Sequence, residues 1–165
     1  MSFITLSSLE RITAPKLAEL LLAAGAAGST NTSSSITAGR EQEQEGRIAI
    51  VDVRDDDHIG GHIRSSLHFP SRSLDAMMPT LLRRLADKEI VVFHCALSQQ
   101  RGPGAALQYL REKEAAASGV SAAAVAKKTQ KVYILDRGFA GWQEVYGLDE
   151  RLTEAYRKDL WEGGY

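Results

Sequence analysis

The stretch EIVVFHCALSQQRGP, residues 89–103, joins an apolar run to a short polar loop and a helix start. The run ends at Cys95, and five residues separate this cysteine from Arg101. Gly102 and Pro103 follow directly, and proline is well placed in the first turn of a helix, so we expect a helix from Gly102 onward. A thiol therefore stands at the end of a strand, beside an arginine and the amino end of a helix.

Similar buried runs lie on both sides of this stretch. Arg47 to Arg54 and Lys131 to Leu135 are short and rich in β-branched residues, which is typical of strands covered on both faces. Further extended segments are expected at Phe3 to Leu6 and at Ser66 to Phe69. Strands that alternate with helices favour a parallel sheet. We therefore expect an α/β fold of three layers, with a central, mainly parallel five-stranded sheet and helices on both faces.

The helices between these strands show periodic apolar residues. PKLAELLLAA, which begins at Pro15, has leucines at helical spacing. A second helix is expected over Ser71 to Ala86, although Pro79 should kink or split it. Its apolar side is assigned to Leu74, Met77, Leu81, Leu82 and Leu85, with Met78 as a further candidate. DRGFAGWQEVYG predicts a turn and a short helix, and a C-terminal helix is expected over Asp149 to Trp161.

Length and composition favour a single domain over residues 1–165. Hydrophobic residues make up 44% of the chain and charged residues 25%, ordinary values for a globular protein. Residues 27–46 contain almost nothing apolar, which predicts a mobile loop insertion. The alanine-rich residues 112–130 predict a helical extension or a loop, with a break near Gly119.

Charge and cysteine content exclude several classes of function. The formal net charge of −1 provides no basic field for nucleic acid or an anionic membrane, so neither partner is expected. The apolar runs are far shorter than the roughly 20 residues of a membrane helix, and MSFITLSSLERIT shows no export or organelle signal. The single cysteine excludes an internal disulfide and fits a reducing compartment, so we expect a cytoplasmic or nuclear protein. The oligomeric state is left open.

The cysteine loop has two interpretations. A lone cysteine at a strand end is often only a small buried hydrophobe. However, ligands of α/β sheets collect beyond the carboxyl ends of the strands, and a helix amino end favours a nearby thiolate. An arginine also offers a planar fork of donors for two oxyanion oxygens. We therefore predict that Cys95 is a nucleophile and that Arg101 binds the oxyanion and stabilises the transition state. The phosphate-binding loop would consist of Ala96, Leu97, Ser98, Gln99, Gln100 and Arg101, with backbone N–H groups as the cradle.

Neighbouring polar residues are assigned supporting roles. Asp52 and Arg54 are expected to form a buried ion pair, because removal of one partner would leave a costly buried charge. His94 either orients the loop through a backbone contact or is purely structural. The Ser98 hydroxyl could donate to the sulfur, assist the leaving group or cap the helix.

Other polar clusters are interpreted as structural. Asp55, Asp56 and Asp57 are expected to be a solvated loop in preference to a cation site. The spacing of His58, His62 and His68 fits no recognised zinc scheme, so we expect packing roles and neither a metal nor a resident cofactor. Asp136 and Arg137 are expected near the rim of the site.

HCALSQQRGP resembles the signature of M-phase inducer phosphatases and of the small eukaryotic arsenate reductases, both of the rhodanese-like superfamily. VDVRDDDHIGGHIRSSLHFP is similar to a second hallmark, an Asp-Val-Arg stretch followed by Gly-His-Ile and a His/Asn-x-Pro strand. DRGFAGW resembles the C-terminal hallmark, a glycine turn followed by Phe-x-x-Trp. The three hallmarks occur in order and imply a rhodanese-like domain over most of the chain.

Loop length separates activities within this superfamily. Its sulfurtransferases generally have a loop one residue shorter, whereas its phosphatases and arsenate reductases have the five-residue spacing seen here. The resemblance implies a protein-tyrosine-phosphatase-like hydrolase of the dual-specificity type, which cleaves phosphotyrosine-like or aryl phosphates through a phosphocysteine. The alternative is arsenate reduction with glutathione or glutaredoxin, so the partner is a phosphorylated substrate or a small oxyanion. Thiosulfate sulfur transfer and a non-catalytic binding module are weaker hypotheses.

Two features depart from the M-phase inducers. Those phosphatases carry acidic residues in and around the loop and a second cysteine that protects the nucleophile as a disulfide. The loop here is neutral and the chain has no second cysteine, so control of cyclin-dependent kinases is not expected. The pattern is more similar to the small stand-alone members of fungi and plants.

Overall fold

The structure, a computed structural model, describes residues 4–27, 47–117 and 130–163. All but the first residue of the predicted insertion at 27–46 therefore lies outside the described residues. Of the segment 112–130, residues 112–117 continue a helix, and the expected break near Gly119 lies outside the described part. No helix in the described ranges is both long enough and apolar enough to span a membrane.

The apolar run at the start of EIVVFHCALSQQRGP forms β5 (Ile90–His94), the middle strand of a five-stranded sheet. The strand order is β1-β6-β5-β2-β4, and every neighbouring pair is parallel. The other strands of this sheet are β1 (Glu10–Ile12), β2 (Ile48–Asp52), β4 (Leu67–His68) and β6 (Lys131–Leu135). The predicted fold class is confirmed.

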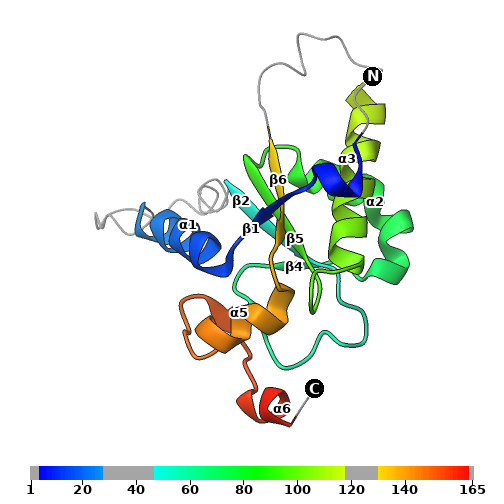
Figure 1. Ribbon diagram of the computed structural model, residues 1–165. Coiled ribbons are helices and arrows are strands. Elements are labelled where there is room, and N and C mark those ends of the chain that lie inside the picture. The colour runs from blue at the N-terminus through cyan, green and yellow to red at the C-terminus, as the bar shows by residue number, and fades with distance from the viewer. Residues whose placement is uncertain (1–3, 28–46, 118–129, 164–165) are drawn as a thin grey trace, which may run out of the picture.

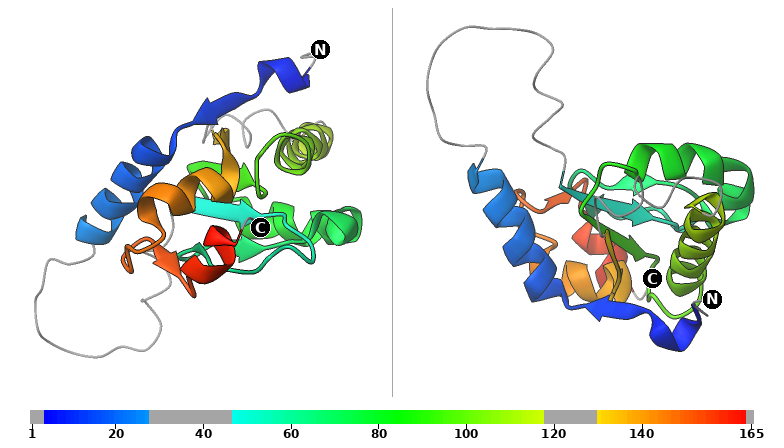
Figure 2. Two further views of the ribbon diagram at one scale, coloured as in Figure 1. Left: turned by 60° about the horizontal axis from the view of Figure 1, so that its bottom comes forward. Right: turned by 90° about the horizontal axis from the view of Figure 1, so that it is seen from above.

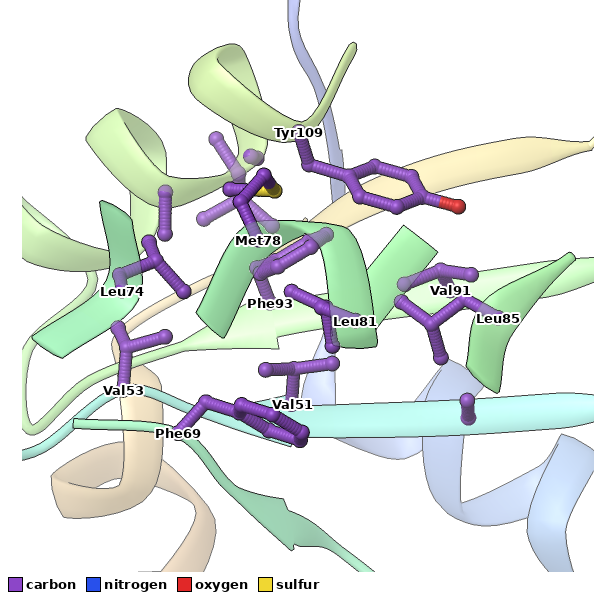
Figure 3. Packing of buried hydrophobic residues seen from close by; sticks show 14 of the residues in the cluster. Val51, Val53, Phe69, Leu74, Met78, Leu81, Leu85, Val91, Phe93 and Tyr109 are labelled. Carbon is purple, nitrogen blue, oxygen red and sulfur yellow. The ribbon is translucent and has the colours of Figure 1, made fainter. Parts of the chain in front are cut away.

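Helices cover both faces of the sheet (Figures 1 and 2). α2 (Leu74–Leu85) and α3 (Arg101–Ala117) lie on one face, and α1 (Ala14–Ala27) and α5 (Gly138–Tyr146) on the other. Because side chains of a strand alternate between the faces, β5 divides its apolar residues between two cores. Val91 and Phe93 pack toward α2 and α3, as Figure 3 shows, whereas Val92 packs toward α1 and α5.

The register of β2 and β5 determines where the loops meet. Asp52 lies opposite His94, so the two strands end side by side. Residues 53–61 and 95–100 therefore leave the sheet at the same edge, where ligands of parallel sheets collect. Gly60 and Gly61, with φ of 79° and 115°, turn the first of these segments back. Residues 53–61 then lead into β3 (His62–Ile63), which pairs antiparallel with β7 (Thr153–Glu154).

The second predicted helix needs two corrections. Residues 71–73 form a separate 3-10 turn, η2 (Ser71–Ser73), and α2 then runs through Pro79 without splitting. The apolar face of α2 includes Met78, which is 3% exposed, whereas Met77 is 38% exposed and points outward. Packing of this face on the sheet outweighs the backbone hydrogen bond that the proline removes.

The two ends of the described chain also differ from expectation. Residues 6–8 form η1 (Leu6–Ser8), and the first strand comes later, at β1. The predicted C-terminal helix over Asp149 to Trp161 is wrong, because this segment contains β7 and only the short α6 (Lys158–Glu162). Thr153 explains the difference: its hydroxyl accepts from Trp142 Nε1 at 3.0 Å and donates to the Tyr146 carbonyl at 2.7 Å. These contacts hold the segment extended against α5.

Candidate active site

Cys95 follows β5 directly and lies at the floor of the loop before α3. Its side chain is buried, with 3% exposure, and its Sγ accepts a hydrogen bond from the Ser98 N–H at 3.2 Å. Ser98 adopts a left-handed conformation, with φ of 54°, so the chain bends back toward the sulfur. The backbone N–H, and the amino end of α3 that follows it, stabilise negative charge at this position.

The peptide groups of the loop are oriented by hydrogen bonds on their outer side. The Cys95 carbonyl accepts from the Phe139 N–H at 3.0 Å, and the Ala96 carbonyl accepts from the Ala140 N–H at 2.9 Å. The Ser98 carbonyl accepts from Arg11 Nη2 at 3.2 Å. In a trans peptide the N–H points opposite to the carbonyl. The next N–H groups in the chain therefore point to the inner side of the loop.

These inward groups are free to bind an anion. The N–H groups of Ala96, Leu97 and Gln99 have no hydrogen-bond partner within the described ranges. Successive free amides around one point form an anion-binding nest. An anion cradle requires this orientation of its N–H groups, and the cradle itself and the role assigned to each of its residues stay predictions.

Gly138 makes the contact between α5 and the loop possible. Its φ is +59°, and a Cβ at this position would lie 2.6 Å from the carbonyl oxygens of both Cys95 and Ala96. Only glycine allows the first N–H groups of α5 to approach these carbonyls. The glycine turn of DRGFAGW therefore acts directly on the cysteine loop.

Arg101, the first residue of α3, is held by two carboxylates from the loop after β2. Its Nη1 and Nη2 donate to the two oxygens of Asp57 at 2.7 and 2.5 Å, and Nη1 also donates to Asp55 Oδ2 at 3.3 Å. The expectation that Asp55 and Asp57 are merely solvated is therefore wrong, since their side chains are 10% and 30% exposed and face the arginine. Asp56 does fit that expectation, with a side chain 92% exposed and paired to Arg72.

A second aspartate–arginine pair lies beneath the loop and is fully buried. Arg54 Nη2 donates to Asp52 Oδ2 at 2.7 Å, and Arg54 Nε donates to Oδ1 at 3.0 Å. The guanidinium also lies 4.4 Å above the centre of the Phe139 ring and donates to the Gly61 carbonyl. The expected ion pair is present, and it ties β2 to the glycine turn and to α5.

His94 contacts both the loop and this buried pair. Its Nδ1 lies 3.0 Å from the Cys95 carbonyl, to which it donates, and its Nε2 lies 3.8 Å from Asp52 Oδ2. The predicted backbone contact to the loop is thus present. Burial lowers the pKa of His94, so the ring is neutral near neutral pH.

The aspartates of the site are ionised. Burial opposes ionisation of Asp52, but the hydrogen bonds and charge of Arg54 lower its pKa from 3.8 to about 2. Hydrogen bonds from Arg101 lower the pKa of Asp57 to about 2 as well. In turn, these hydrogen bonds raise the pKa of Arg101, which stays a cation. Neither Asp52 nor Asp57 carries a proton at neutral pH.

The Ser98 hydroxyl makes none of the contacts considered from the sequence. It is fully buried and, among the residues that the structure describes, has no hydrogen-bond partner, so it does not cap α3. The predicted donation from this hydroxyl to the sulfur is therefore wrong, and its help to the leaving group stays a prediction.

The remaining candidates lie at the edge of the site. Asp136 pairs with Arg11 at 3.4 Å, and Arg11 also holds the loop, whereas Arg137 turns away to pair with Glu144. His58 stacks on His68, with ring centres 3.8 Å apart, so these rings pack as expected. No group of three metal-ligating side chains is found in residues 4–27, 47–117 and 130–163, and the expectation of no metal stays a prediction.

Sequence reasoning missed Asp55, Asp57 and Arg11 as parts of the site. The two aspartates had a usable signal, because they follow the end of β2 directly and parallel neighbours end at the same edge of a sheet. Arg11 lies on β1, separated from the loop in sequence by 87 residues, and carries no such signal.

Comparison with known proteins gives consistent results. Residues 37–145 match the sequence profile of the rhodanese-like domain. CDC25-like phosphatase YCH1 of Saccharomyces cerevisiae is 38% identical over 122 residues, which cover 68% of this chain and 76% of that protein. Arsenate reductase 2.1 of Oryza sativa subsp. japonica is 43% identical over 101 residues, which cover 59% of this chain and 57% of the rice protein.

The structural comparison agrees. The crystal structure of Saccharomyces cerevisiae Ygr203w, described as a homolog of single-domain rhodanese and the Cdc25 phosphatase catalytic domain, superposes with a TM-score of 0.67. It is 29% identical, and the match covers 98% of this chain and 97% of that one. The resemblance inferred from the three hallmarks is confirmed: the chain belongs to the rhodanese-like domain family.

Proposed function

We propose that this chain is a cysteine-dependent phosphatase that hydrolyses phosphotyrosine-like or aryl phosphomonoesters through a phosphocysteine. The observation that carries the proposal is the loop itself, in which the Ser98 N–H donates to the Cys95 sulfur, further N–H groups point to the inner side, and Arg101 follows at the phosphatase spacing. The relatives include both phosphatases and arsenate reductases, so the two main activities inferred from the sequence are supported.

The reaction proceeds in two displacements. The Cys95 thiolate attacks phosphorus, a P–S bond forms, and the P–O bond to the leaving group breaks. Water then attacks the phosphocysteine, the P–S bond breaks, and inorganic phosphate leaves with the thiolate regenerated. The loop amides and Arg101 stabilise the negative charge of the equatorial oxygens in both transition states.

The electrostatics of the site favour aryl substrates. Departure of the leaving group requires a proton or a stable anion, and Asp57 is ionised and committed to Arg101. A phenol, with a pKa of about 10, leaves as an anion far more readily than an alkyl alcohol. The sequence names no proton donor; Asp136, other nearby acids and the substrate itself are the candidates.

Arsenate reduction is the second candidate, favoured by the similarity to the rice enzyme. The Cys95 thiolate would displace hydroxide from arsenate in the same cradle. An external thiol would then attack the sulfur, so that the two thiols supply the two electrons, arsenite leaves and a mixed disulfide remains. A second external thiol must resolve that disulfide, because the chain contains no other cysteine.

Thiosulfate sulfur transfer and partner binding without catalysis have less support. The loop spacing argues against sulfur transfer, which cyanide-dependent thiocyanate formation would test directly. A non-catalytic binding module has no need for unpaired N–H groups in the cysteine loop. If Cys95 did not react with iodoacetate near neutral pH, that result would favour such a module. The cytoplasmic or nuclear location and the lack of nucleic-acid and membrane partners stay predictions.

The experiment that tests the proposal compares the wild type with Cys95→Ser. The wild type is expected to release phosphate from an aryl phosphate, and the variant is expected to lose turnover while it still binds vanadate or phosphate. Retained turnover in Cys95→Ser would rule out the phosphocysteine. Rates with arsenate plus glutathione and glutaredoxin, and with thiosulfate, on the same preparation rank the three reactions.

A further inference from the structure

The two carboxylates occupy only part of the Arg101 guanidinium. Asp57 accepts one hydrogen from each terminal nitrogen, Nη1 and Nη2, and Asp55 accepts a second hydrogen from Nη1. A guanidinium carries five N–H donors in one plane. The hydrogen on Nε and one hydrogen on Nη2 are therefore left over, and they lie on the same edge of the group.

Arg54 shows in the same protein what this edge can bind. Its Nε and Nη2 hydrogens hold the two oxygens of Asp52 side by side. In Arg101 the equivalent edge has no partner within the described ranges, although this side chain is only one-third exposed. Two oxygens of a tetrahedral oxyanion match the same fork.

The carboxylates that hold Arg101 are themselves fixed by the chain. Asp57 Oδ1 accepts the Asp55 N–H at 2.9 Å. The oxygens of Asp55 accept the Ser71 hydroxyl at 2.5 Å and the Arg72 N–H at 3.0 Å. A long arginine side chain has many rotamers in solution, so a fixed anchor on one edge reduces the entropy lost when the other edge binds a ligand.

We propose that Asp57, supported by Asp55, is a positioning residue that grips the terminal nitrogens of Arg101 and leaves the Nε–Nη2 edge to the oxyanion. The inference rests on the proposed function and extends it to residues outside the cysteine loop. It also makes the loop after β2 a part of the oxyanion site, because Arg101 is shared between the two loops.

The test compares Asp57→Ala with Asp56→Ala. Both changes remove one negative charge from the same loop, but Asp56 contacts Arg72 and makes no contact with Arg101. Inorganic phosphate is the probe, measured as a competitive inhibitor of aryl phosphate turnover and as a protectant of Cys95 against iodoacetamide. Asp57→Ala is expected to raise the inhibition constant about 10- to 100-fold, the scale of a misplaced binding group, and to lower kcat. In Asp56→Ala, the inhibition constant and kcat are expected to stay within about twofold of the wild-type values.

Two further variants separate positioning from general damage. Asp57→Asn keeps the shape of the side chain but loses the paired charge, so it is expected to weaken phosphate binding as well. Asp57→Glu keeps the carboxylate and is expected to recover part of the affinity, which a change in folding alone would not produce. Thermal unfolding of each variant is measured beside the inhibition constants.

The outcomes are distinct. Unchanged phosphate binding in Asp57→Ala would overturn the inference, and so would tighter binding, which would make Asp57 a competitor of the oxyanion. Failure of the proposed function gives a different result: the wild type itself would hydrolyse no aryl phosphate, and phosphate would not protect its Cys95.

Discussion

Two aspartate–arginine pairs that meet at this edge of the sheet, Asp52–Arg54 and Asp57–Arg101, differ in exposure and in which edge of the arginine is used. Asp52 and Arg54 are fully buried and pair through the Nε–Nη2 edge. Asp57 and Arg101 are each about one-third exposed and pair through the terminal nitrogens. In the first pair the Nε–Nη2 edge of the arginine is occupied, whereas in the second this edge has no partner among the described residues. The same two residue types thus serve structure in one place and ligand binding in the other.

The largest expected effect comes from breaking the buried pair. Asp52→Ala would leave the Arg54 charge buried without its partner, which costs about 3–5 kcal/mol. Urea unfolding measures the loss. The control is Asp56→Ala, a change at an exposed side chain, and its free energy of unfolding is expected to stay within about 0.5 kcal/mol of the wild-type value. Equal stabilities of the two variants would contradict the structural role of Asp52.

Breaking the exposed pair is expected to affect catalysis more than stability. Arg101→Ala removes the oxyanion donors, so kcat/KM for an aryl phosphate should fall about 10²- to 10³-fold. The unfolding free energy should fall by less than about 1 kcal/mol, because a partly exposed ion pair contributes little. A loss of stability as large as that of Asp52→Ala would mean that the two pairs do not differ in role.

A change at Gly138 is expected to affect stability and catalysis together. In Gly138→Ala the left-handed backbone and the close carbonyls of Cys95 and Ala96 would cost toward the upper end of about 1–3 kcal/mol. Turnover should fall as well, since α5 orients the peptides of the loop. Gly104→Ala is the matched control, because a Cβ there meets nothing within 4 Å. If both variants behave as the wild type does, α5 does not hold the loop.

The pH dependence of stability sharpens the comparison further. Asp52 and Asp57 both have pKa values lowered from 3.8 to about 2, so folding favours their ionised forms. The resulting stabilisation is complete above about pH 4 and is lost as the pH falls toward 2; for Asp52 it amounts to about 2 kcal/mol. Urea unfolding between pH 2 and 5 is expected to show this loss in the wild type. In Arg101→Ala the part due to Asp57 should disappear and the part due to Asp52 should remain, so a flat profile in that variant would contradict the assignment.

Sequence patterns predicted the parts of the molecule that depend on local periodicity. The strands β2, β5 and β6 consist mainly of apolar residues, and such runs are typical of strands buried between two layers. The cysteine loop was also predictable, because the end of a strand, five residues and the start of a helix follow one another directly in the chain.

Features that depend on tertiary contacts were not predictable in this way. A helix was expected over Asp149 to Trp161, but β7 pairs with β3 and the Thr153 contacts hold this segment extended. Met77 and Met78 are adjacent and equally apolar, so only packing on the sheet decides which of them is buried. The grip of Asp57 on Arg101 joins residues 44 positions apart and required the register of β2 and β5 to be known.

The most direct measurement looks for the covalent intermediate itself. Acid quenching of the wild type during turnover of an aryl phosphate, followed by mass spectrometry of its peptides, should find the phosphoryl group on Cys95. Cys95→Ser should release no phosphate and carry no such adduct. Phosphate release at equal rates by both proteins, or a phosphoryl group trapped on another residue, would contradict nucleophilic catalysis by Cys95.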